Sequence, residues 1–169
     1  FDNIGATGHS QGGLASYRAG LDPRVDAIAP TQPFNSNIPF LENNFSGSAP
    51  SAIDVPAFTT SGSLDTVVPP YMVTAQHNAT SSESIYANAL GAGHFTPAGA
   101  GGEYTAYNTA WFKYHLMGDE TAGQLFYGDN PVLGQDANWS MNSNAAAEAR
   151  LIPDGPITAE TLNSVYGWG

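Results

Sequence analysis

The chain has 169 residues, of which 41% are hydrophobic and 11% aromatic, which is enough apolar material for one globular domain and excludes a disordered or fibrous chain. Four basic residues against 15 acidic ones give a formal net charge of -11, which disfavours nucleic acid and anionic membranes as partners. The absence of cysteine excludes disulfides, thiolate metal sites and a cysteine nucleophile.

The composition also bears on location. No apolar run approaches the roughly 20 residues that cross a bilayer, so we expect no membrane span. Few lysines, many Asn, Ser, Thr and Gly residues and an acidic balance favour an extracellular, secreted protein over a cytosolic one.

The first part of the chain predicts a strand, a helix and a second strand. Residues 4–8 form a short β-compatible run, and residues 11–19 form a helix that ends at Gly20. Residues 25–29 are the second apolar run. The composition of residues 31–56 then changes to Asn, Ser, Pro and Phe, which predicts a long loop.

The next part repeats this alternation. Strands are predicted at residues 55–61 and 84–90, and a helix opened by Pro69 and Pro70 runs between them to about residue 79. Because strands that alternate with helices indicate βαβ units, the sequence predicts an α/β fold with a mostly parallel sheet.

Residues 103–117 give the clearest helix. Tyr104, Tyr107, Trp111 and Tyr114 recur at spacings of three and four, which predicts one aromatic stripe packed against the sheet, and Gly118 ends the helix. From residue 119 onward the chain is polar and irregular, with short helices expected near residues 145–150 and 158–165.

Residues 8–12 read Gly-His-Ser-Gln-Gly, a G-x-S-x-G pattern between a predicted strand and a predicted helix. This context is typical of a nucleophile elbow, in which Ser10 lies on a sharp turn and Gly8 and Gly12 avoid collisions with nearby backbone. In such a turn the Gln11 backbone N–H contributes to an oxyanion hole at the start of the helix.

Asp65 is the candidate acid, because it falls just beyond a predicted strand, where a parallel sheet presents its functional loops. A carboxylate there orients a histidine ring and stabilises its charged form. The alternative is that Asp65 caps the helix that opens at Pro69. Asp54 is a second acid candidate, but it precedes its strand and so lies at the opposite edge of the sheet.

His94 is the candidate general base, because it also follows a predicted strand and lies on a glycine-rich loop. The other three histidines have structural explanations. His9 lies inside the elbow and packs beneath it, His77 lies on a polar helix, and His115 lies near a helix end where a positive charge suits the dipole.

With Ser10, Asp65 and His94 in this chain order, the sequence resembles the serine α/β-hydrolases. Within them it is similar to the branch of bacterial cutinases and polyethylene terephthalate hydrolases, with dienelactone-hydrolase-like and chlorophyllase-like esterases close by. The resemblance runs from residue 4 to about residue 128, through residues 8–13, 29–34, 62–69, 93–94 and the helix that contains Trp111. It implies a cofactor-free and metal-free serine esterase with a Ser10–Asp65–His94 triad and the Gln11 amide in the oxyanion hole.

The resemblance also implies substrate-binding residues. Phe34 matches an aromatic residue that clamps the acyl part of the substrate, with a loop aromatic folded into the core as the alternative, and we expect His9 to contribute to the same site. The polyester hydrolases usually have Trp in place of Phe34, Met in place of Gln11 and a disulfide near the C-terminus, and an insertion at residues 35–51 lengthens the loop before the acid. Ester hydrolysis is therefore the expectation, with amide cleavage, acyl transfer or a non-catalytic binding module as alternatives.

In this family the elbow follows a strand that pairs with strands from the N-terminal half, and a loop of that half supplies the second oxyanion amide. We therefore expect residues 1–128 to form the C-terminal half of a catalytic domain, with about four strands, and residues 129–169 to form a tail or extension that packs on the same domain. The expected partners are an ester substrate and the enzyme's own N-terminal half.

Overall fold

The structure is a computed structural model that describes residues 2–34, 50–99, 101–150, 152 and 155–167. Most of the insertion noted at residues 35–51 lies outside the described residues. Of that insertion only Pro50 and Ser51 are described, at the start of the short helix η1 (Pro50–Ala52).

The described strands form one sheet in the order β1-β2-β3-β4-β5. The first four strands are parallel, and β5 pairs with β4 in the antiparallel sense. The prediction of a mostly parallel α/β sheet is confirmed, but the expectation of about four strands missed β5, because residues after 119 were interpreted as irregular. The strands are β1 (Gly5–His9), β2 (Ala27–Thr31), β3 (Ala57–Gly62), β4 (Ser84–Ala89) and β5 (Trp139–Ser143).

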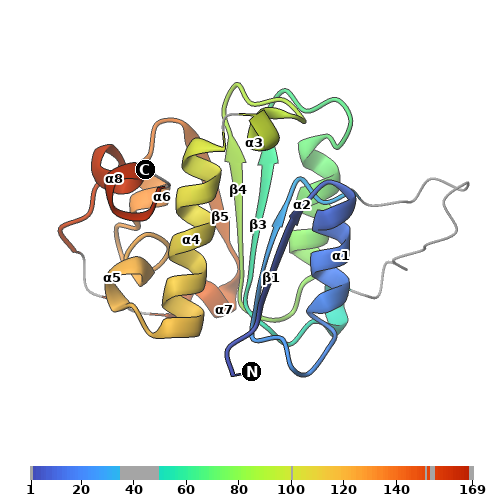
Figure 1. Ribbon diagram of the computed structural model, residues 1–169, viewed down its shortest axis with the longest axis horizontal. Helices are drawn as coiled ribbons and strands as arrows, with labels where there is room; N and C mark the ends of the chain where they lie inside the picture. The colour runs from blue at the N-terminus through green and yellow to red at the C-terminus, as the bar shows by residue number, and fades with distance from the viewer. Residues whose placement is uncertain (1, 35–49, 100, 151, 153–154, 168–169) are drawn as a thin grey trace, which may run out of the picture.

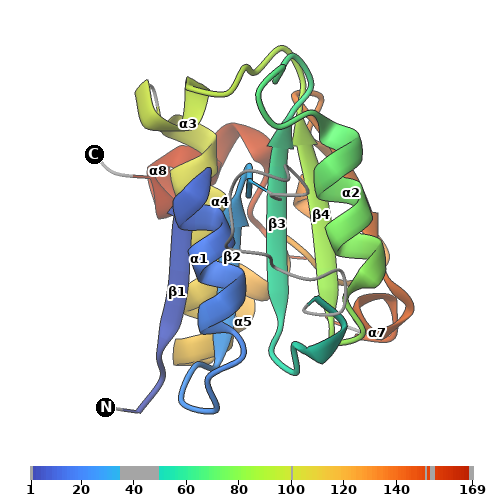
Figure 2. The ribbon, with the colours of Figure 1, turned by 90° about the vertical axis from the view of Figure 1, so that its right-hand side faces the viewer.

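Helices cover both faces of this sheet (Figures 1 and 2). Helices α1 (Gln11–Ala19) and α2 (Pro70–Ala79) lie on one face, and α4 (Gly102–Met117) lies on the other. The two short helices expected late in the chain are present as α7 (Ala145–Glu148) and α8 (Leu162–Tyr166). The shorter elements are α3 (Thr96–Gly99), α5 (Glu120–Gly123), α6 (Val132–Gln135), α7 (Ala145–Glu148), η2 (Ala159–Thr161) and α8 (Leu162–Tyr166).

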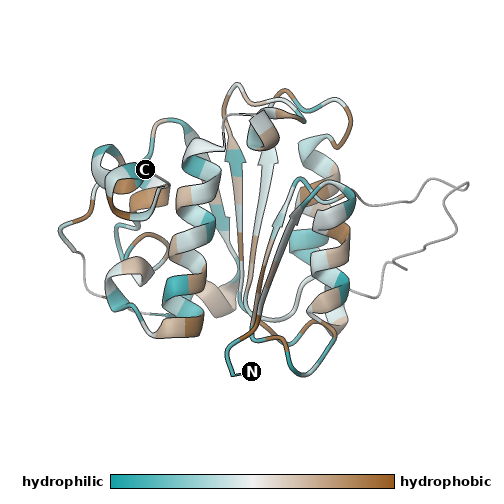
Figure 3. Cartoon of the chain, in the orientation of Figure 1, coloured by the Kyte–Doolittle hydropathy of each residue, from teal (hydrophilic) through white to brown (hydrophobic). Residues whose placement is uncertain are grey.

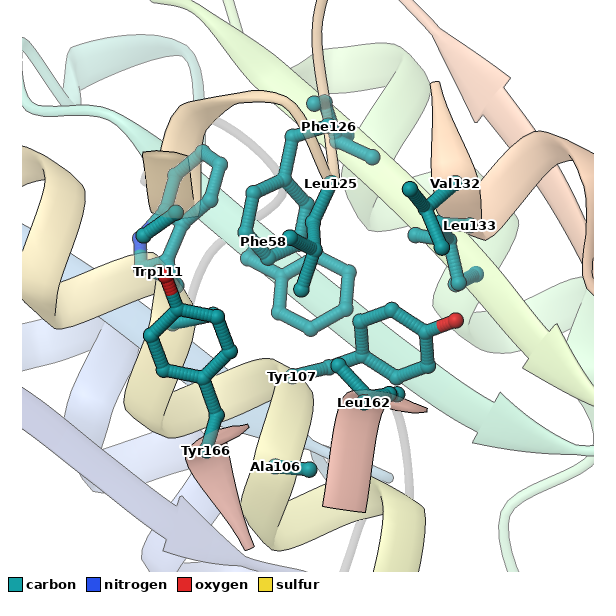
Figure 4. Close-up of a cluster of buried hydrophobic side chains, with 14 of the residues drawn as sticks. Phe58, Ala106, Tyr107, Trp111, Leu125, Phe126, Val132, Leu133, Leu162 and Tyr166 are labelled. Atoms are coloured by element: carbon teal, nitrogen blue, oxygen red, sulfur yellow. The ribbon is translucent and has the colours of Figure 1, made fainter. Parts of the chain in front are cut away.

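The larger part of the core lies between the sheet and α4 (Figure 4). Tyr107 and Trp111 are fully buried there, and the Trp111 ring lies 5.6 Å from the ring of Phe58 on β3. The predicted aromatic stripe is therefore a packing surface. Helix α4 ends at Gly118, which adopts the left-handed conformation (φ 69°) that glycine tolerates without a steric cost.

The two edges of the sheet differ. The described residues of the segment 129–169 supply β5 at one edge and pack against β4 and α4. At the other edge, β1 pairs with β2 alone among the described residues. This is the edge beside which the sequence predicts strands of an N-terminal half, and that expectation stays a prediction. Within the described part of the chain, no helix has the length and apolar character that a membrane span requires.

Candidate active site

Ser10 lies on the turn between β1 and α1, at the carboxyl end of the parallel strands (Figure 1). Its backbone has φ 57° and ψ -115°, a conformation that residues with a Cβ rarely adopt. Three hydrogen bonds hold it: the Ser10 amide donates to the Thr31 carbonyl at 3.0 Å, and the Ser10 carbonyl accepts from the amides of Leu14 and Phe34 at 3.1 and 3.0 Å. The turn therefore has the strained geometry expected of a nucleophile elbow.

The glycines of the elbow have different roles. A Cβ at Gly8 would lie 2.6 Å from the Gly12 carbonyl, so no side chain fits there. A Cβ at Gly12 would meet nothing within 4 Å, so the expectation that Gly12 avoids a collision is wrong. Gly13 has the second steric role instead, because its Cβ would lie 2.8 Å from the Pro33 Cα.

Asp65 follows β3 and is 3% exposed. One carboxylate oxygen, Oδ1, accepts hydrogen bonds from the amides of Val67 and Val68, each at 2.8 Å. The other oxygen, Oδ2, lies 2.7 Å from His94 Nδ1. Asp65 therefore stabilises the turn at residues 65–68 and contacts the histidine at the same time. The alternative that it caps the following helix is wrong, because the N-cap of α2 is Pro69 and no described side chain bonds there.

His94 follows β4 and is 7% exposed. Because a carboxylate accepts at its Nδ1, this nitrogen carries the proton in the neutral ring, and Nε2 is left as the acceptor. His94 Nε2 lies 3.0 Å from Ser10 Oγ, which is the geometry a general base needs to take the hydroxyl proton. The three residues that the sequence selects thus form one continuous hydrogen-bonded series.

Gln11 is the first residue of α1, and its amide donates to no acceptor among the described residues. As a free N–H at the positive end of a helix, it can accept the charge of an oxyanion. Phe34 is half-buried and packs against a small apolar cluster of Val68, Val73 and Tyr86. Its position beside the Ser10 backbone agrees with the predicted location, and its contact with substrate stays a prediction.

The His9 side chain contacts the loop that carries His94, with the two imidazole ring centroids 4.7 Å apart. Its Nε2 lies 2.7 Å from the carbonyl oxygen of His94 and 2.9 Å from Oε1 of Gln32. The prediction that His9 packs beneath the elbow is not supported by these contacts, which join His9 to Gln32 and to the loop of His94, and its expected role in substrate binding stays a prediction. Gln32 was not selected from the sequence, although a polar residue between Thr31 and Pro33 at the end of a predicted strand was a signal.

The remaining candidates lie outside the site. Asp54 is exposed and precedes β3, as expected. His77 lies on helix α2, as predicted, where it is buried with its Nδ1 2.8 Å from Ser84 Oγ, and burial lowers its pKa. Burial and the charge of Arg150 lower the pKa of His115 to about 3, so the expected positive charge at the helix end is absent.

Exposed apolar side chains lie on the loops that carry Asp65 and His94. The loops after β3 and β4 and the first turn of α2 carry five of the large exposed hydrophobic residues, and Figure 3 shows apolar colouring in the loops at this end of the sheet. Exposed apolar residues on the loops of a polar centre are typical of a binding surface for apolar ligands. They are Leu64, Val67, Tyr71, Leu90 and Phe95.

A comparison with protein-family models and with curated proteins finds no match to this chain. The assignment of the site therefore rests on its own geometry.

Proposed function

We propose that the chain carries a serine hydrolase site of the α/β-hydrolase type, which cleaves carboxylic esters through an acyl-enzyme on Ser10. The observation that carries the proposal is the unbroken series from Ser10 Oγ to His94 Nε2 (3.0 Å) and from His94 Nδ1 to Asp65 Oδ2 (2.7 Å). Each of the three side chains comes from a loop at the same edge of a parallel sheet, and two of them are almost fully buried.

The geometry supports the following chemistry. Ser10 Oγ attacks the ester carbonyl carbon while its proton moves to His94 Nε2, and Asp65 stabilises the imidazolium that forms. The tetrahedral oxyanion accepts a hydrogen bond from the Gln11 amide. His94 then protonates the leaving alkoxide, and a water molecule activated by the same ring hydrolyses the acyl-enzyme.

We also propose that a second oxyanion donor comes from a segment that lies beside β1. Two features support this: the Gln11 amide is a single donor, and the outer edge of β1 has no strand partner among the described residues. The removal of one oxyanion donor costs about 10²- to 10³-fold in turnover in well-studied hydrolases, so a site with one donor would be slow.

The substrate that fits this surface is an ester with apolar groups. Leu64, Val67 and Phe95 present apolar side chains beside the catalytic loops, and the net charge of -11 disfavours anionic substrates. We therefore expect neutral esters with apolar acyl or alcohol groups to be hydrolysed faster than charged ones.

A fluorophosphonate probe tests the proposal directly, because it reacts with a serine that a general base activates. The expected result is one covalent adduct on the peptide that contains Ser10, with no adduct in Ser10→Ala. Hydrolysis of p-nitrophenyl butyrate should be lost in the same variant. An unlabelled protein that unfolds cooperatively would refute the proposal, and faster cleavage of a matched anilide than of the ester would redefine the site as an amidase.

A further inference from the structure

The loop that carries His94 is held by two side chains that the reaction itself does not use. The Gly93 carbonyl accepts a hydrogen bond from Gln32 Nε2 at 3.1 Å, and the His94 carbonyl accepts one from His9 Nε2 at 2.7 Å. Gln32 Oε1 also lies 2.9 Å from the same His9 nitrogen, so the two side chains contact each other. Together they donate hydrogen bonds to two consecutive carbonyls, Gly93 and His94, of the loop that follows β4, which is called the base loop below.

The acceptors around His9 define where the protons are. Both partners of His9 Nε2 are oxygens that only accept, so this nitrogen carries a proton and shares it between them. The Gln32 amide is then fixed in one orientation, with its NH₂ group toward Gly93 and its oxygen toward His9. The His9 ring and the Gln32 amide therefore each have one arrangement of donors and acceptors that satisfies all of these hydrogen bonds.

The surrounding backbone is shaped around this pair. Gln32 is 0% exposed and has φ 44°, a left-handed conformation that is uncommon outside glycine. At the end of β3, a Cβ on Gly62 would lie 2.7 Å from Gln32 Nε2 and 2.4 Å from the Ala92 carbonyl oxygen. Because Gly62 has no side chain, the Gln32 amide and the Ala92 carbonyl can both lie close to the end of β3. Strained backbone that is held by buried polar contacts is found preferentially at functional sites.

We infer that His9 and Gln32 are positioning residues, which hold the base loop in the position where His94 Nε2 lies within hydrogen-bond distance of Ser10 Oγ. This inference rests on the proposed function. The bond to Asp65 fixes one ring nitrogen, but on its own it leaves the ring free to pivot about that contact. Because His9 directly precedes Ser10, its bond to the His94 carbonyl joins the strand of the nucleophile to the loop of the base. A rigid link of this kind maintains reactive geometry, in which a displacement of about 1 Å costs about 10²-fold in rate.

Three variants separate hydrogen bonding from ring packing. His9→Phe keeps an aromatic ring and removes the N–H, whereas His9→Gln places an amide N–H near the former Nε2. Gln32→Met keeps the length of the side chain and removes both hydrogen-bonding atoms. Tyr17→Phe is the matched control, because it removes a buried hydroxyl that bonds Thr59 Oγ1 at 2.7 Å, on α1 away from the base loop.

The readouts are kcat and KM for p-nitrophenyl butyrate, the rate of fluorophosphonate labelling, and the low-field proton resonance of the His94–Asp65 hydrogen bond. We expect His9→Phe and Gln32→Met to lower kcat by about 10- to 100-fold with little change in KM, and to weaken or broaden the resonance. His9→Gln should recover most of the loss, and Tyr17→Phe should keep the wild-type kcat. Thermal unfolding of every variant separates these effects from loss of fold.

Wild-type kcat in both His9→Phe and Gln32→Met would overturn the inference, as would a His9→Gln variant as slow as His9→Phe. If His9→Phe fails to fold, Gln32→Met decides by the same criteria. If the wild-type protein is not labelled at Ser10, the proposed function fails instead, and the resonance alone decides the inference: retention in Gln32→Met overturns it, and loss supports it.

Discussion

The backbone strain at Ser10 leads to a prediction about stability. Ser10 has φ 57° and ψ -115°, held by hydrogen bonds to Thr31, Leu14 and Phe34. Glycine adopts these angles without steric cost, whereas any residue with a Cβ does not. Replacement of Ser10 by glycine should therefore relieve strain, although it removes the nucleophile. Ser10→Ala is the matched comparison, because it also lacks the hydroxyl but keeps the Cβ and hence the strain.

The expected size of the effect follows from two opposing terms. A non-glycine residue in a sparsely populated backbone conformation costs about 1–3 kcal/mol in the folded state. Glycine increases the conformational entropy of the unfolded chain, which offsets about 0.4–1 kcal/mol of that gain. The free energy of unfolding of Ser10→Gly should thus exceed that of Ser10→Ala by about 0.5–2 kcal/mol. For a chain of this length, this corresponds to a rise in Tm of roughly 1–8 °C.

The measurement is urea and thermal unfolding of the two variants, followed by circular dichroism, with fluorophosphonate labelling as a check that both are inactive. Equal m-values would show that the two variants unfold by the same transition. A Ser10→Gly variant that is no more stable than Ser10→Ala would refute the reasoning, because the turn would then hold Ser10 without strain.

Three further predictions follow from the site and its surroundings. Gly13→Ala should be destabilised by about 1–3 kcal/mol through the contact at 2.8 Å, whereas Gly12→Ala, with open space and a helical position, should be neutral or slightly more stable; comparison of their urea midpoints checks this. Asp65→Asn should keep the fold and lower kcat by about 10³- to 10⁴-fold, since an amide favours the wrong His94 tautomer, and steady-state kinetics on an ester measures it. The pKa of His115 is about 3 in the folded state and about 6.5 in the unfolded state, so as the pH falls below 7 the unfolded state takes up a proton while the folded state does not, and the free energy of unfolding decreases. Between pH 7 and pH 5 the free energy of unfolding of the wild type should decrease by about 2 kcal/mol more than that of His115→Phe. Equal decreases in denaturant titrations of the two proteins would contradict this.

The sequence predicted those parts of the fold that depend on local patterns. The helix at residues 11–19 was predicted with its exact bounds, and the aromatic spacing in α4 identified the face that packs on the sheet. Strand β5 was missed because residues 139–143 contain two Ser and one Asn, which have low β-propensity. The strand forms because Trp139 and Met141 pack against the core while β4 supplies hydrogen-bonding partners, and both causes are tertiary.

The candidate triad was predictable because its residues follow strands of a parallel sheet, so topology alone brings them to one edge. Side-chain environments were less predictable. His115 was expected to be charged, but it is buried beside Tyr127, to which its Nε2 bonds at 2.9 Å, and Arg150 lies nearby. Glu83 lies 3.6 Å from the same nitrogen, yet it is already paired with Arg150 and Tyr127, so it does not hold the ring in its charged form. Contacts between residues 83, 127 and 150 have no local sequence signal.

The positive-φ residues Ser10 and Gln32 indicate how this edge of the sheet is built. They follow adjacent strands, β1 and β2, and each is anchored on the next strand: the Ser10 amide bonds the Thr31 carbonyl at 3.0 Å, and the Gln32 amide bonds the Thr60 carbonyl at 2.7 Å. The strained turn after β1 is thus held by a hydrogen bond to β2, and the strained residue after β2 is held by a hydrogen bond to β3. The second anchor, the Thr60 carbonyl, belongs to a fully buried residue of β3, a strand in the middle of the sheet that is paired on both sides.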